Sequence, residues 1–129
     1  MSVPPERALG ILLISGTHTR AHYAFVLAAG AAAIGRRVTV FATNAGCRAL
    51  CGDWSGLQGA ADDDTVRARG VAGFATLRDA AIELGVRLIA CDAGLRVAGI
   101  ASDALLPVVE VAGVATFLDA AGDGQMISL

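Results

Sequence analysis

The amino-acid sequence predicts an α/β protein of three layers, α/β/α, in which helices cover both faces of a mostly parallel five-stranded sheet. Short apolar runs alternate with longer helix-forming segments, an order typical of strand–helix–strand units. One phrase also occurs twice. At residues 34–41 and 84–91, a helix end is followed by glycine, one further residue, arginine and an apolar strand. Because such units wind with one hand, two joints of the same design predict parallel strands in a single sheet.

Composition limits the class of protein. Hydrophobic residues make up 55 % of the 129 residues, charged residues make up 17 %, and the formal net charge is −2. We therefore expect one domain, residues 1–129, without the basic surface that nucleic-acid binding requires. The longest uncharged segment, residues 21–35, is shorter than the roughly 20 apolar residues that cross a bilayer, so we expect no membrane association. The apolar excess predicts a homo-oligomer instead.

The cysteines and the N-terminus predict a cellular compartment. The chain has three cysteines, an odd number that disfavours a disulfide framework. Residues 1–7 lack the charged start, apolar stretch and cleavage site of a signal peptide. We therefore expect a cytoplasmic protein with reduced thiols.

Apolar runs and glycines define the expected elements. Strands are expected at residues 9–15, 37–42, 86–90, 108–111 and 125–129. Helices are expected at residues 21–34, 74–84 and 113–121, with a shorter one at residues 96–100. Thr19 is expected to cap the first helix, and Gly35 and Gly85 to end the first two. Phe41 and Cys91 then occupy equivalent strand ends.

Residues 44–73 are the least regular part of the chain. They contain an acidic run followed by two arginines, namely Asp62, Asp63, Asp64, Arg67 and Arg69. We expect a solvated loop tip with local ion pairs. A mobile flap over the edge of the sheet is the alternative.

Cys91 is the candidate functional residue. It follows the strand expected at residues 86–90, at the edge where open α/β sheets bind their ligands. Gly94 allows the chain to turn, and a helix after it would direct its positive end at the thiol. Arg96 is a candidate counter-charge, whereas the carboxylate of Asp92 disfavours the thiolate.

Two further pairs of side chains follow the first two strands. Cys47 and Cys51 have the same spacing as His18 and His22, and the four could meet at the carboxyl edge of the sheet. Two cysteines and two histidines form a chemically sound zinc set. The spacing is common, however, and His22 lies in an apolar helix, so we expect no metal.

Glu110 is expected at the carboxyl end of the strand at residues 108–111. There it would point into the same cleft as Cys91. A structural hydrogen bond or an intersubunit ion pair is the expected role, rather than acid–base catalysis.

The second half of the chain resembles the DsrE/DsrF-like family. The resemblance lies in residues 83–91, 99–100 and 109–118, and the order of elements in residues 9–41 agrees with it. It implies a compact α/β/α protein that assembles as a homotrimer or hexamer. It also implies sulfur relay, in which the cysteine after the third strand, here Cys91, accepts sulfane sulfur as a persulfide or thiosulfonate.

That resemblance implies partners but no cofactor. The sulfur would pass to a small sulfur-carrier or rhodanese-type protein, which makes the chain sulfurtransferase-like. Cys47 or Cys51 could resolve a Cys91 persulfide or act as a second carrier; structural cysteines are the alternative. Related sequences often follow the cysteine with Gln, Met and Ser, whereas residues 92–95 here are Asp, Ala, Gly and Leu. A non-catalytic oligomeric binding module is therefore the alternative function.

Overall fold

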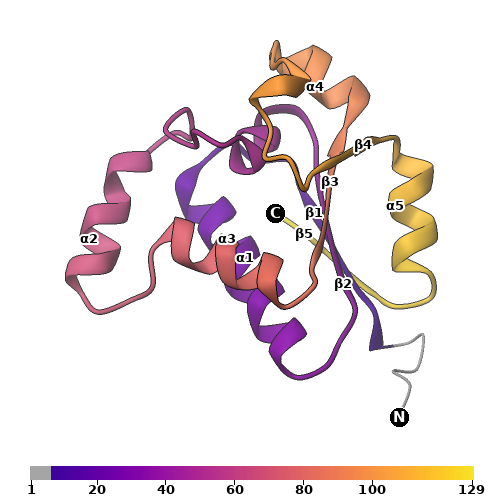
Figure 1. Ribbon diagram of the computed structural model, residues 1–129, viewed down its shortest axis with the longest axis horizontal. Coiled ribbons are helices and arrows are strands. Elements are labelled where there is room, and N and C mark those ends of the chain that lie inside the picture. Colours follow the sequence, from indigo (N-terminus) through magenta and orange to yellow (C-terminus); the bar gives the residue numbers. More distant parts are fainter. Residues whose placement is uncertain (1–6) are drawn as a thin grey trace.

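All strands of the computed structural model, which describes residues 7–129, belong to one parallel sheet (Figure 1). The strand order is β4-β3-β2-β1-β5, and each neighbouring pair is parallel. The strands are β1 (Leu9–Leu13), β2 (Val38–Ala42), β3 (Arg87–Cys91), β4 (Glu110–Ala112) and β5 (Gln125–Ser128). The predicted α/β fold with a five-stranded parallel sheet is confirmed.

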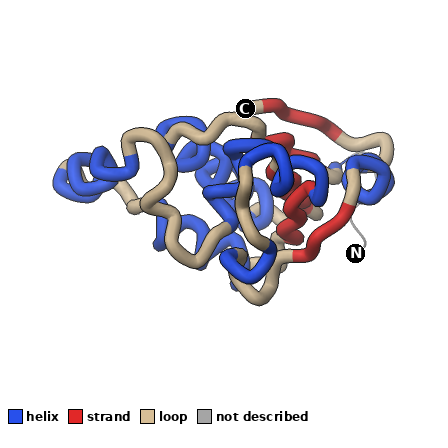
Figure 2. Tube along the Cα trace, turned by 90° about the horizontal axis from the view of Figure 1, so that it is seen from above, coloured by secondary structure: helices blue, strands red, loops and turns tan. Residues whose placement is uncertain are grey.

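Helices cover both faces of this sheet. α1 (His18–Ala33) and α3 (Phe74–Glu83) pack together on one face, and α5 (Val114–Ala121) covers the other. Figure 2 shows the strands between these two helical layers. Gly35 and Gly85 end α1 and α3 with φ values of 89° and 84°, as predicted. Within the part of the chain that the structure describes, no helix is long and apolar enough to span a membrane.

The two faces of the sheet carry separate cores. The α1 and α3 face holds the larger core, in which the rings of Phe25 and Phe74 meet edge-on at 5.5 Å. The α5 face holds a small core of Phe41, Ile89 and Phe117, where the two phenyl rings stack at 4.9 Å. Fully burying one such side chain contributes roughly 1.5–3 kcal/mol. The attachment of α5 therefore depends strongly on Phe117.

The first helix begins earlier than predicted. Thr17, not Thr19, is its N-cap, and the Thr17 hydroxyl accepts a hydrogen bond from the Arg20 N–H at 3.4 Å. Thr17 is extended, with φ −88° and ψ 144°, which is the backbone conformation an N-cap needs. His18 is consequently the first residue of the helix and is buried.

The irregular region contains short helical turns. They are η2 (Asn44–Leu50), η3 (Ala60–Asp62) and α2 (Asp63–Ala68). The expected solvated ion pair is present between Arg67 and the exposed Asp64. The expectation is wrong for Asp63, which is 4 % exposed, because its carboxylate is needed as a hydrogen-bond acceptor inside the fold.

The helix after β3 also begins earlier than predicted. α4 (Asp92–Ala98) starts directly after Cys91 and ends at Gly99, and η4 (Ser102–Ala104) follows. An acidic residue in the first turn of a helix is favourable, which suits Asp92 to this place. Gly94 therefore lies within the helix instead of forming a turn before it.

Candidate functional site

Cys91 is the last residue of β3 and is half-buried. Its side chain packs against the small core of Phe41, Ile89 and Phe117, as the alternation of a strand requires for residues two apart. β2 ends at Ala42, which pairs with Ala90, so Cys91 lies one residue beyond the end of β2. The predicted equivalence with Phe41 is wrong, since Phe41 pairs with Ile89.

The thiol of Cys91 is a hydrogen-bond acceptor at the start of α4. Cys91 is the N-cap of that helix, and its Sγ accepts the backbone N–H of Gly94 at 3.3 Å. A hydrogen bond to a charged acceptor is stronger than one to a neutral acceptor. The thiolate is the form that attacks sulfur, and the Gly94 N–H is placed to donate to this reactive atom.

Gly94 also lets α4 lie directly on the start of η2. A Cβ atom at residue 94 would lie 2.5 Å from the backbone nitrogen of Asn44 and 2.9 Å from Cα of Thr43, and closer still to the Thr43 hydroxyl. Real Cβ atoms do not make such contacts with backbone. Because residue 94 has no side chain, α4 can pack directly against the start of η2 beside Cys91.

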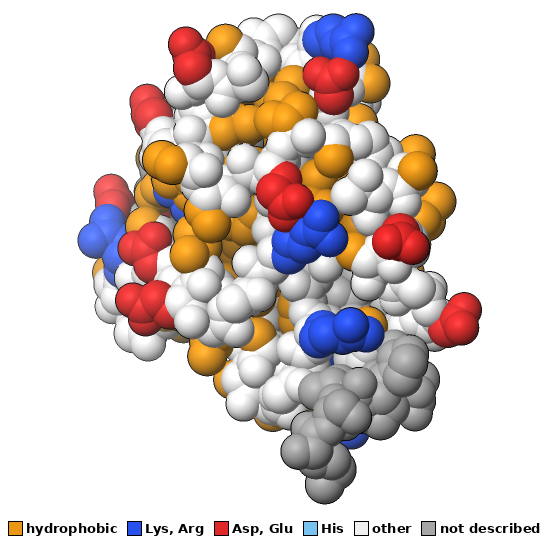
Figure 3. All heavy atoms as spheres, turned by 45° about the vertical axis from the view of Figure 1, so that its right-hand side comes forward, with side chains coloured by type: hydrophobic (Ala, Val, Ile, Leu, Met, Phe, Trp, Pro, Cys, Tyr) orange, Lys and Arg blue, Asp and Glu red, His pale blue; other side chains and the backbone are white. Residues whose placement is uncertain are grey.

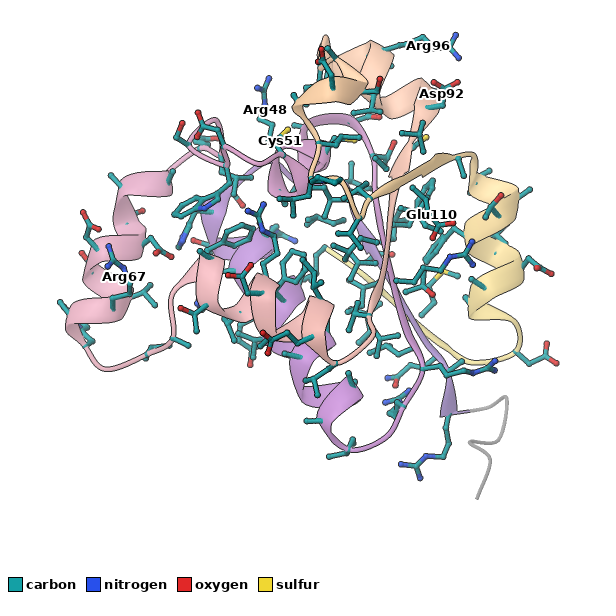
Figure 4. The ribbon with its side chains drawn as sticks, viewed as in Figure 1. Arg48, Cys51, Arg67, Asp92, Arg96 and Glu110 are labelled. Atoms are coloured by element: carbon teal, nitrogen blue, oxygen red, sulfur yellow. The ribbon has the colours of Figure 1, made fainter. Side chains whose placement is uncertain are left out.

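Asp92 and Arg96 pair with each other on the outside of α4. Figure 4 shows both side chains on the right-hand, outer side of this helix. Arg96 is therefore not the counter-charge of Cys91 that the sequence suggested. The ion pair partly neutralises Asp92, and this reduces its repulsion of a thiolate at Cys91.

The other two thiols are buried in and after η2. Cys47 Sγ donates to the carbonyl of Ala42 at 3.5 Å, and Cys51 Sγ donates to the carbonyl of Cys47 at 3.6 Å. Burial, and then the charge of the Cys91 thiolate, raise the pKa of Cys47 to about 11. Burial also raises the pKa of Cys51, despite the nearby arginines. Both thiols are therefore protonated at neutral pH, and Cys91 is the most exposed of the three.

The histidines do not lie beside Cys91. His18 Nε2 is 2.7 Å from Oδ1 of Asp63, and His22 Nε2 is 2.8 Å from the carbonyl of Ala72. The two rings are 5.6 Å apart on the α1 side of the sheet. Among residues 7–129, no three His, Cys, Asp or Glu side chains are placed to hold a metal ion.

Asp63 is a buried residue that the sequence did not single out. Burial tends to raise its pKa, but hydrogen bonds from His18 and the Phe74 N–H, with the charge of Arg67, hold the pKa below its usual value. The sequence held one indirect signal. α3 begins after Gly73, which has no side chain to accept a hydrogen bond from the first N–H groups of the helix. Another residue therefore had to accept the Phe74 N–H, and Asp63 does so.

Glu110 opens β4 instead of closing it. It pairs with Ile89, whereas Ala112 pairs with Cys91, so the expected position beside the thiol is wrong. Glu110, labelled in Figure 4, accepts hydrogen bonds from Nε and Nη2 of Arg87 at 2.6 and 2.8 Å. The hydrogen bonds from Arg87 lower the pKa of Glu110. β4 begins two residues later than predicted, because residues 108 and 109 do not pair with β3.

The fold and this edge of the sheet define a class of protein: a parallel α/β/α protein with a thiol at the carboxyl end of its third strand. Within that class, the chain belongs to the DsrE/DsrF/DrsH-like family, whose model matches residues 53–128. The resemblance seen in the sequence is thereby confirmed.

A solved structure shows the same fold. It is a protein of unknown function from Methanobacterium thermoautotrophicum, which is 19 % identical with a TM-score of 0.55. The similarity covers 95 % of this chain and 99 % of that one. Among curated proteins, no match was found.

Proposed function

We propose that the chain is a sulfur carrier, with sulfurtransferase-like chemistry, that holds sulfane sulfur on Cys91. The observation that carries the proposal is the placement of this partly exposed thiol at the end of β3, where the Gly94 N–H donates to its sulfur. Family membership supports it.

The transfer needs only thiols. The Cys91 thiolate attacks the outer sulfur of a donor persulfide, R–S–SH. A bond forms between Cys91 Sγ and that sulfur, the donor S–S bond breaks, and R–S⁻ leaves. An acceptor thiolate, R′–S⁻, then attacks the outer sulfur of Cys91–S–SH, which yields R′–S–SH and regenerates the Cys91 thiolate. Neither step requires a cofactor or an external oxidant.

Exposed apolar side chains lie on the elements next to Cys91. The most exposed are Val97 on α4, at 73 %, and Val114 and Leu118 on α5, at 56 % and 52 %. Such groups favour contact with other chains. We propose a homo-oligomer, a trimer or hexamer, that meets a small sulfur-carrier or rhodanese-type acceptor in the cytoplasm, where thiols remain reduced.

One observation favours the alternative, a non-catalytic oligomeric binding module. Asp92 places a carboxylate directly after the thiol, and such a charge disfavours the thiolate. In this reading, Cys91 is only the cap of α4.

Intact-mass measurement distinguishes the two functions. The purified chain is incubated with polysulfide or tetrathionate, and a carrier should gain reductant-labile sulfur or thiosulfonate mass. Cys91→Ser should abolish the gain, whereas the matched variant Cys51→Ser should keep most of it. Asp92→Asn should speed labelling. Labelling confined to Cys47 or Cys51 would refute the role of Cys91, and no labelling with several donors would favour the binding module.

A further inference from the structure

We propose that the amino end of the sheet, opposite to Cys91, binds a tetrahedral oxyanion such as a phosphate group. A pocket of about 330 Å³ lies there, between the first residues of β2 and β3 and the last turn of α5. The described residues that line it include Arg36, Arg37 and Arg87 and no carboxylate. The lower part of Figure 3, where the strands begin, shows basic side chains on this side of the molecule.

The repeated phrase of the sequence brings two of these arginines together. Arg37 and Arg87 hold the same place in the two copies, just ahead of or at the start of neighbouring parallel strands. Arg87 pairs with Thr39, so Arg37 lies two residues earlier on the same face of the sheet. The spacing of strands and the rise per residue put their Cα atoms about 8 Å apart. Two arginine side chains can reach one anion across this distance.

Two of the three guanidinium groups are already oriented. Arg36 donates Nε to the carbonyl of Arg7 at 2.8 Å and Nη2 to Oε1 of Gln125 at 3.0 Å. Arg87 is held by both carboxylate oxygens of Glu110. Among residues 7–129, Nη1 of each has no hydrogen-bond partner. Fixed donors bind at a smaller entropy cost, and these two Nη1 groups are the donors that remain for an anion.

The charge balance of the pocket favours an anion. Glu110 neutralises part of the charge on Arg87, and Asp119 of α5 also acts on it. Within the described residues, neither Arg36 nor Arg37 has an ion pair. Apolar side chains complete the wall, among them Ala32, Leu84 and Ala120. They suit the organic part of a phosphate ester, because ligand pockets combine apolar walls with a few polar groups.

An NMR titration tests this site. The ¹⁵N-labelled Cys91→Ser chain is titrated with inorganic phosphate and, separately, with phenyl phosphate, at constant ionic strength. We expect saturable shifts of the backbone amides of Arg37, Gly85 and Arg87. Arg37→Gln should weaken binding at least tenfold, whereas Arg20→Gln, which removes an exposed arginine of α1, should leave it unchanged.

The two probes also identify the form of the ligand. Tighter binding of phenyl phosphate assigns the site to a phosphate ester, and equal binding assigns it to free phosphate. The proposal is overturned if neither probe shifts these amides saturably, or if Arg37→Gln binds as well as the parent chain. Because Cys91 is replaced in every sample, the outcome does not depend on sulfur transfer.

Discussion

Gly94→Ala should both destabilise the chain and slow the reaction of Cys91. The new Cβ would lie 2.5 Å from the Asn44 nitrogen and 2.9 Å from Thr43 Cα, so α4 must move away from η2. Overpacking of this kind costs about 1–3 kcal/mol, against a gain of at most about 1 kcal/mol in helix propensity. Because two of the three contacts are with backbone, we expect a cost at the upper end of that range and a net loss of about 2 kcal/mol in the free energy of unfolding.

The same shift should lengthen the hydrogen bond from the Gly94 N–H to Cys91 Sγ, now 3.3 Å. A hydrogen bond to a charged group contributes about 1.5–3 kcal/mol. Because the thiolate is the form that attacks, loss of this bond should slow labelling of Cys91 severalfold at neutral pH.

Urea unfolding and stopped-flow thiol labelling measure the two effects. Gly30→Ala is the matched control, because residue 30 is an exposed glycine of α1 with nothing within 4 Å of its Cβ position. That variant should stabilise the chain by about 0.5–1 kcal/mol and leave labelling unchanged. A Gly94→Ala chain as stable and as reactive as its parent would refute the close packing of α4 on η2.

Further predictions follow from the buried groups and the surface. The pKa of Asp63 is held below its usual value, so its stabilising contribution is present above about pH 4 and is lost as the pH falls through the lower native pKa. Asp63→Asn should therefore flatten the dependence of urea stability on pH between pH 5 and 2. An unchanged pH dependence would contradict this. With a pKa of about 11, Cys47 should not react at neutral pH. A thiol assay should therefore find one fast-reacting thiol in the native chain and three in urea. A second fast-reacting thiol in the native chain would contradict this prediction. Phe117→Ala should cost about 3–5 kcal/mol in urea unfolding and speed labelling of Cys91, whereas a cost below 1 kcal/mol would show that the ring stack does not hold α5. Light scattering should find an oligomer at micromolar concentration, which Leu118→Asp should weaken; a monomeric parent chain would refute the predicted assembly.

The local sequence determined the elements and the place of the thiol. Periodicity and glycines located the five strands and the three main helices, and the end of β3 at Cys91 followed from where the apolar run stops. These features depend on residues close together in the chain. The starts of two helices, α1 and α4, were predicted wrongly because their N-caps are Thr17 and the sulfur of Cys91, which the sequence pattern did not favour.

The tertiary structure decided which charged and polar groups meet. Nothing within residues 62–64 distinguishes Asp63 from its neighbours, yet only Asp63 is buried against His18. In the same way, Arg87 and Glu110 meet because β3 and β4 are adjacent, and Gly94 is required because η2 lies on it. Each of these contacts joins residues more than 20 positions apart or on different elements, so its energy depends on the register of the sheet and the packing of helices, which no local pattern encodes.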